Sequence, residues 1–128
     1  ALGEVAGMLL WNELCDEKLE EIATNEHFEL FDFKVTNRPA YVDFKHWKES
    51  TIFSDKEMLD KISAKAKKCN AQCVFIVNLL AKHDFPVTRR TYNGTRIIQL
   101  PAFILNKKVN IKYLKVIKEE LYALSNQN

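Results

Sequence analysis

Residues 28–47 constrain the fold of this chain more than any other stretch of its sequence. Two segments rich in Phe, Tyr and Val, 28–35 and 40–47, stand on either side of Thr36-Asn37-Arg38-Pro39. The Asn and Pro of this connection are typical of a turn, and the aromatic and β-branched residues around it are typical of strands. The pattern therefore predicts a β-hairpin.

The predicted hairpin brings acidic residues together. If its four-residue loop is symmetric, Val35 faces Ala40 and Asp32 faces Asp43. Facing side chains have Cβ atoms about 4.5–5.5 Å apart, and residues two apart on a strand share a face, which adds Lys45. Two carboxylates about 5 Å apart repel by about 3 kcal/mol at an effective dielectric constant of about 20. A divalent cation relieves this repulsion, so the pattern predicts a Mg²⁺ site with an ammonium beside it.

These residues resemble a known motif. Asp32, followed on the next predicted strand by Asp43-Phe44-Lys45, is similar to the motif of the PD-(D/E)xK nuclease superfamily, which has the restriction-endonuclease-like fold. The resemblance covers residues 3 to about 80, and Phe31 stands where the motif has Pro. It implies that Asp32 and Asp43 bind Mg²⁺ or Mn²⁺ and that Lys45 positions or activates the attacking water.

The same resemblance assigns a role to the first predicted helix, residues 2–14. A Glu on this helix often completes the site in the superfamily, and Glu4 corresponds to it. Alternatively, Glu4 is an acid in a first helical turn, where it favours the helix dipole. The apolar residues of the helix fall on one broad face and its two glycines allow close packing, so we expect it to be buried. These residues are Leu2, Val5, Ala6, Leu9, Leu10 and Leu14, with Gly3 and Gly7.

The hairpin also has a purely structural interpretation. Asp32, Asp43 and Lys45 would then line a wet face of the sheet, with the lysine in an ordinary surface ion pair that adds little stability.

Cations and aromatic residues near the hairpin and on a second predicted ribbon are candidates for contact with nucleic acid. Asn93-Gly94 predicts a two-residue hairpin turn within residues 87–100, because both positions accept positive φ. The arginines of this ribbon either contact a nucleic-acid groove or backbone, or protect an exposed strand edge. The candidate nucleic-acid-binding residues are Lys34, Trp47, Lys48, Arg89, Arg90 and Arg96.

The rest of the chain predicts an α/β fold with a mixed central sheet flanked by helices. A capping box at Ser54 predicts a lysine-rich helix to about residue 68, and the apolar run 73–81 predicts a strand buried on both faces. Residues 110–124 have the period of an amphipathic terminal helix. The expected order is a restriction-endonuclease-like α-β-β-α-β core, then a β-hairpin and a C-terminal helix. The acidic stretch 16–26 fits either a short helix or an irregular strand.

The composition limits the number of domains and the environment that we expect for this chain. The 128 residues, 47% of them hydrophobic, suit one domain, and the start without Met leads us to expect a piece of a longer chain. No apolar run approaches the length of a membrane span, and three cysteines are an odd number for a disulfide framework. We therefore expect a cytoplasmic domain without membrane association, with a secreted toxin domain left open.

The expected function is Mg²⁺- or Mn²⁺-dependent hydrolysis of phosphodiester bonds, of DNA in preference to RNA. The expected partner is nucleic acid, and a homodimer or a larger parent protein with helicase or other DNA-processing domains stays open. The net charge of +2 permits such binding without requiring it. The alternative is a catalytically inactive nuclease-like module that binds nucleic acid or a protein partner.

Overall fold

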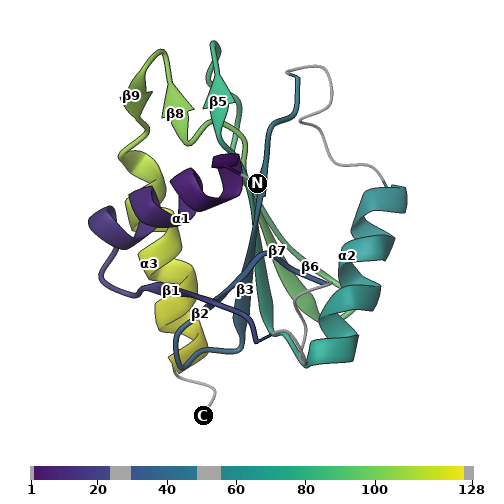
Figure 1. Cartoon of the computed structure of the whole chain (residues 1–128). Helices are drawn as coiled ribbons and strands as arrows, with labels where there is room; N and C mark the ends of the chain where they lie inside the picture. Colours follow the sequence, from purple (N-terminus) through teal and green to yellow (C-terminus); the bar gives the residue numbers. More distant parts are fainter. Residues whose placement is uncertain (1, 24–29, 49–55, 126–128) are drawn as a thin grey trace.

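The computed structural model describes residues 2–23, 30–48 and 56–125 (Figure 1). Within these ranges the chain has an α/β fold with three helices, a mixed six-stranded sheet and a small three-stranded sheet. The elements are α1 Leu2–Leu14, β1 Leu19–Glu21, β2 Phe33–Val35, β3 Ala40–Lys45, α2 Lys56–Cys69, β4 Cys73–Asn78, β5 Leu80–Ala81, β6 Thr88–Tyr92, β7 Thr95–Leu100, β8 Ile104–Leu105, β9 Lys108–Val109 and α3 Lys112–Ser125.

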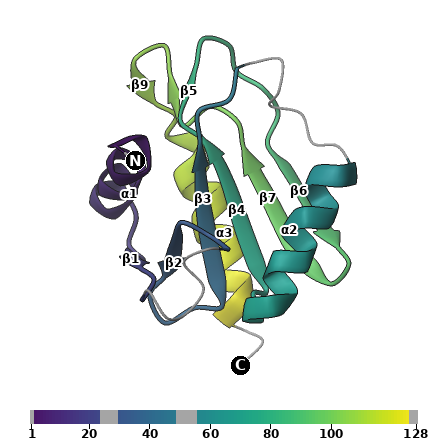
Figure 2. The same ribbon diagram turned by 45° about the vertical axis from the view of Figure 1, so that its right-hand side comes forward.

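The large sheet has the strand order β1-β2-β3-β4-β7-β6. Strands β3, β4 and β7 are parallel to one another, whereas β2 and β6 run antiparallel to their neighbours. Helices α1 and α3 cover one face and α2 covers the other (Figures 1 and 2). The predicted mixed sheet flanked by helices is confirmed, and the acidic stretch contains β1, a strand that the expected order lacked.

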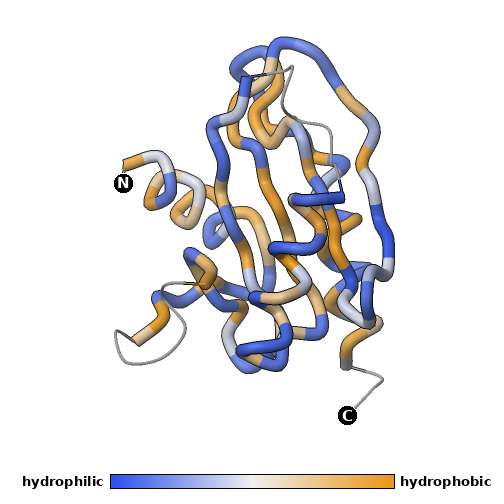
Figure 3. The backbone as a smooth tube through the Cα atoms, turned by 90° about the vertical axis from the view of Figure 1, so that its right-hand side faces the viewer, coloured by the Kyte–Doolittle hydropathy of each residue, from blue (hydrophilic) through white to orange (hydrophobic). Residues whose placement is uncertain are grey.

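The alternation of side chains along the central strands divides the core into two layers. Val42 and Phe44 of β3 pack on the side of α1 and α3, whereas Tyr41 packs on the side of α2. All six residues of β4 are buried, which confirms the predicted strand with two buried faces, although it ends at Asn78. Figure 3, which views α2 from outside, shows hydrophobic strands in the middle of the sheet.

The face of α1 that packs against the sheet is not the face that its leucines form. Gly3, Gly7 and Trp11 are four residues apart, and this face is the one that meets β3. A Cβ atom at Gly7 would lie 2.6 Å from the Phe44 ring, and one at Gly3 would lie 1.9 Å from His46 Nε2. The predicted close packing at the glycines is therefore confirmed. The predicted burial of the leucine face is wrong, because the closest approach occurs where side chains are absent; Leu2, Val5 and Leu9 are exposed.

The second predicted hairpin forms, but not as a free ribbon. Asn93 and Gly94 have φ angles of 49° and 84°, as a tight hairpin turn requires. Strand β7 is paired with β4 inside the large sheet, so β6 is the strand of this hairpin that lies at an edge of the sheet. The predicted capping residue Ser54 lies outside the described residues. Within the described ranges, no helix combines the length and the apolar character needed to cross a membrane.

Candidate active site

The two aspartates meet where β2 begins and β3 ends. The β2–β3 register pairs Phe33 with Val42 and Lys34 with Tyr41, and its continuation places Asp32 opposite Asp43. The predicted register is therefore confirmed. Because Tyr41 packs toward α2 and alternate residues share a face, Asp43 and Lys45 also face α2. This face is not a wet sheet surface, since α2 covers it and Asp43 is only 6% exposed.

Reciprocal hydrogen bonds fix the two carboxylates. Asp43 Oδ1 accepts the backbone N–H of Asp32 at 2.8 Å, and Asp32 Oδ2 accepts the backbone N–H of Phe44 at 3.0 Å. The second oxygen of Asp43 lies 3.8 Å from Lys45 Nζ. The carboxylates are thus held in place by the hairpin itself, which the sequence pattern did not predict.

The environment of Asp32 favours its protonated form. Burial raises its pKa to about 6, and the negative charge of Asp43 adds to this shift. The N–H of Phe44 and the ammonium of Lys45 oppose the shift, whereas Glu4 reinforces it. A divalent cation at this place would lower the energy of two adjacent carboxylates that otherwise disfavour one another.

Asp43 shows the same tendency from deeper burial. Its burial raises its pKa, against the N–H of Asp32 and the charges of Lys45 and Lys65, while Glu4 raises it further. Lys65 belongs to α2, the predicted lysine-rich helix, and was not among the predicted site residues. Its position three residues after Ile62 and four before Cys69, both buried, is the signal that could have placed it toward the sheet.

Glu4 lies near the pair but does not complete a set of three ligands. It is partly exposed at the start of α1, and its charge acts on both aspartates. Among the described residues, however, no three His, Cys, Asp or Glu side chains converge closely enough to hold a metal ion. The three-acid site implied by the resemblance is therefore not assembled here; the structure brings together two carboxylates and the amine of Lys45.

Gln99 extends the same polar row across the sheet. The registers place Asp43 beside Ile76, Ile76 beside Gln99, and Gln99 beside Thr88. Gln99 is buried; its Oε1 accepts the hydroxyl of Thr88 at 2.8 Å, and its Nε2 has no hydrogen-bond partner within the described part of the chain.

The predicted nucleic-acid contacts divide between the two faces of the sheet. Lys34 shares the face of Asp32, and Trp47 and Lys48 follow directly after β3. Lys45 Nζ lies 5.8 Å from the centre of the Trp47 ring, so this tryptophan adjoins the carboxylate pair. Arg90 also faces α2, because it pairs with Ile97.

Arg89 and Arg96 lie on the opposite face. Arg96 donates from Nε and Nη2 to the buried carboxylate of Glu120 at 2.9 and 3.2 Å. Arg89 pairs with Glu119 at 3.0 Å and with Glu120 at 3.5 Å. Both arginines therefore join the sheet to α3, and the structure does not bring them to the candidate site.

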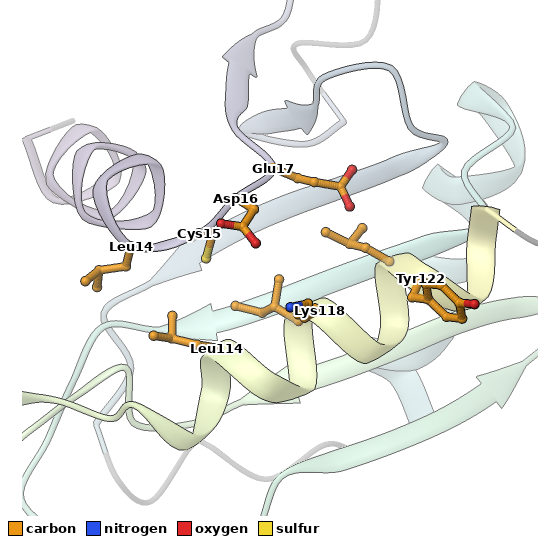
Figure 4. Close-up of a pocket in the computed structure, with 9 residues that line it drawn as sticks. Leu14, Cys15, Asp16, Glu17, Leu114, Lys118 and Tyr122 are labelled. Atoms are coloured by element: carbon orange, nitrogen blue, oxygen red, sulfur yellow. The ribbon is translucent and has the colours of Figure 1, made fainter.

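A small cavity of about 220 Å³ lies between the C-terminal end of α1 and α3, on the side of the sheet opposite Asp43 (Figure 4). Leucines, Ile117 and Cys15 line much of it. Burial raises the pKa of the Cys15 thiol to about 11, so the thiol stays protonated near neutral pH. This cavity contributes nothing to the carboxylate site.

No protein-family model matches this sequence, and no curated protein is significantly similar to it.

Proposed function

We propose that this chain is a Mg²⁺- or Mn²⁺-dependent nuclease that hydrolyses phosphodiester bonds, of DNA in preference to RNA. One observation carries the proposal. Asp32 and Asp43 face each other across neighbouring strands, and Lys45 Nζ lies 3.8 Å from Asp43 on the same face. They stand near the carboxyl ends of β3 and β4, the edge at which α/β sheets commonly bind ligands.

The donor set fits a hard divalent cation. Each carboxylate uses one oxygen for a backbone N–H and keeps a second oxygen, and Mg²⁺ is usually held by one or two carboxylates together with water and phosphate oxygens. Such an ion would neutralise part of the phosphate charge and lower the pKa of an attacking water. Burial of Asp43 and the raised pKa of Asp32 make a cation favourable there.

Side chains of the protein would orient the attacking water and stabilise charge on the phosphate. Lys45 carries a positive charge next to Asp43, where it would orient the attacking water or stabilise charge on the phosphoryl oxygens. Lys65 reaches the same region from α2. Glu4, close enough to act on both aspartates, would orient water at the entrance to the site.

A plasmid-nicking assay with Mg²⁺ or Mn²⁺ tests the proposal. Asp43→Asn keeps an oxygen for the N–H of Asp32, and Lys45→Ala removes the amine; we expect each change to lower cleavage by at least about 100-fold. Lys115→Ala, an exposed lysine on α3 across the sheet, serves as the control and should cleave like the wild type. Wild-type cleavage by both Asp43→Asn and Lys45→Ala would overturn the assignment.

A second candidate is a catalytically silent module that binds nucleic acid or a protein. The reciprocal bonds to backbone N–H groups favour it, because they give both aspartates a structural role without any ion. Calorimetric titration with Mn²⁺ distinguishes the two. The nuclease requires a site that disappears in Asp32→Asn, whereas the silent module shows no heat that depends on Asp32.

A further inference from the structure

A groove lies next to the carboxylate site, beyond the carboxyl ends of β3 and β4. It has a volume of about 860 Å³. The segment after β3 forms one wall, and the small sheet β5-β8-β9, at the top of Figure 1, forms the other. Its lining residues are Trp47, Lys48, Leu80, Ala81, Lys82, His83, Ile104, Asn106 and Lys107.

The lining of the groove is basic. Among the described residues that line it, three are lysines, one is a histidine and none is acidic. Asp84 follows His83 directly but binds Lys112 and Asn110 near the start of α3. Clustered positive charge in a concave surface attracts polyanions, which the adjacent carboxylates by themselves would repel.

The groove also has an aromatic wall that is joined to the site. The backbone N–H of Trp47 donates to Asn78 Oδ1 at 2.7 Å, which fixes the chain after β3 against the end of β4. Lys45 Nζ lies 5.8 Å from the ring of the same tryptophan. Trp47 is partly exposed, and an indole face in a basic groove suits the stacking of a base.

The opposite wall is fixed by backbone hydrogen bonds. The N–H of Ile104 donates to the carbonyl of Leu79 at 2.7 Å, and the N–H of Asn106 donates to that of Ala81 at 3.2 Å. Asn106 and Lys107 form the turn between β8 and β9, with φ angles of 49° and 68°. The groove is therefore preformed, and Lys107 stands at its rim on a tight turn.

We propose that this groove binds a single-stranded segment of nucleic acid, with a base stacked on Trp47 and phosphates on Lys48, Lys82 and Lys107. A duplex conceals the faces of its bases, whereas a single strand offers both base faces and phosphates to a surface of this kind. That this strand continues to the phosphodiester at Asp32 and Asp43 rests on the proposed function; binding in the groove does not.

Binding of oligothymidylate in a buffer containing a chelator tests the groove apart from cleavage. The chain has two tryptophans, and Trp11 is fully buried, so quenching of fluorescence reports on Trp47. We expect Lys82→Glu/Lys107→Glu to weaken binding at least about 10-fold and to make the salt dependence shallower by about 1.4 in the log-log slope. Trp47→Leu should abolish the quenching and weaken binding about 5- to 150-fold.

The control is Lys115→Glu, which changes an exposed charge on α3 across the sheet and should bind like the wild type. Circular dichroism and the thermal midpoint verify that each variant is folded. Unchanged binding in the folded double variant, or equally tight groove-dependent binding of a blunt duplex, would overturn the proposal. Groove-dependent binding by a protein that never cleaves would support the groove and count against the proposed function alone.

Discussion

Asp32 and Asp43 differ from ordinary surface aspartates because the protein makes their ionisation unfavourable and then holds them together. Burial raises both pKa values, the charge of Asp43 raises the pKa of Asp32 further, and backbone N–H groups of the same hairpin oppose the shift of each. A pair with these properties binds protons or cations more readily than solvated carboxylates do. These properties of the two aspartates have two measurable consequences.

The first consequence is a pH dependence of metal binding. The pKa of Asp32 is raised from 3.8 to about 6, so at pH values between these two the folded state holds a proton that the unfolded state has released. This group's contribution to stability is complete below about pH 4 and is lost as the pH rises through about 6. A metal ion competes with the same proton, so Mn²⁺ affinity should decrease as the pH falls below about 6.

Calorimetry at several pH values, in buffers of different ionisation enthalpy, measures the affinity and the proton release together. Asp32→Asn should remove the proton release. A Mn²⁺ affinity that stays constant from pH 5 to pH 8 would contradict the expectation.

The second consequence separates the charge of Asp43 from its hydrogen bond. Asp43→Ala leaves the N–H of Asp32 without its acceptor and should lower the free energy of unfolding by about 1–3 kcal/mol. Asp43→Asn keeps an acceptor and removes a buried charge, so its stability should equal or exceed that of the wild type. Urea unfolding at neutral pH measures both variants, and equal losses in the two would show that the hydrogen bond is unimportant.

At the scale of elements, packing between α1 and β3 depends on glycine. Gly7→Ala places a Cβ atom 2.6 Å from the buried Phe44 ring, and such overpacking typically costs about 1–3 kcal/mol. Leu9→Ala is the control on the same helix, because Leu9 is 60% exposed, and it should change stability by less than about 0.5 kcal/mol. Chemical denaturation tests the pair; a Gly7→Ala variant as stable as Leu9→Ala would refute this packing.

The contact between α3 and the β6–β7 hairpin depends on one carboxylate. Glu120 is buried and accepts from Arg96, and it also pairs with Arg89. Glu120→Ala should lower the free energy of unfolding by about 1.5–3 kcal/mol, since hydrogen bonds to charged groups are the stronger kind. Arg96→Ala should leave oligothymidylate binding unchanged, because Arg96 binds Glu120. A large loss of binding in this variant would show that Arg96 contacts the nucleic acid after all.

Much of the strand structure could be predicted because it depends on local signals. The turn at residues 36–39 fixed the register that pairs Asp32 with Asp43, and Asn93-Gly94 fixed the second turn. The exposed face of α1 could not be predicted, because its periodicity shows where the leucines lie and not that glycines provide the contact. Strand β1 has only three residues, too few for a clear alternation.

The candidate site was predicted only in part, for a similar reason. Asp32, Asp43 and Lys45 follow from one hairpin, whereas Lys65 approaches from a helix whose packing is a tertiary property. Arg89 and Arg96 were predicted as candidate nucleic-acid contacts, but the acids of α3 that bind them lie 24 or more residues away in sequence. No local pattern shows such a pairing.

At the scale of the whole molecule, the two faces of the sheet differ in composition. The face under α1 and α3 holds the larger core and the arginine pairs, whereas the face under α2 carries the polar row and leads to the basic groove. The groove and the carboxylates share the carboxyl ends of the parallel strands. Under the proposed function, ligands would therefore bind on one side of the sheet, while the other side holds the larger core.

The three cysteines report on the integrity of the whole fold. Cys15 just after α1, Cys69 on α2 and Cys73 on β4 are buried free thiols, and burial raises the pKa of each. We expect a thiol reagent such as DTNB to react slowly with the native protein and with all three thiols together across the urea transition. Rapid reaction of one thiol in the native state would reveal local opening at its element.

The reciprocal bonds of the hairpin give the molecule its own spectroscopic probes. The amide protons of Asp32 and Phe44 point at carboxylates instead of at a neighbouring strand. Their ¹H and ¹⁵N chemical shifts in NMR spectra should follow each event at those oxygens, whether protonation or the arrival of an ion. Two backbone resonances would thus read the state of the acidic pair without any label attached to it.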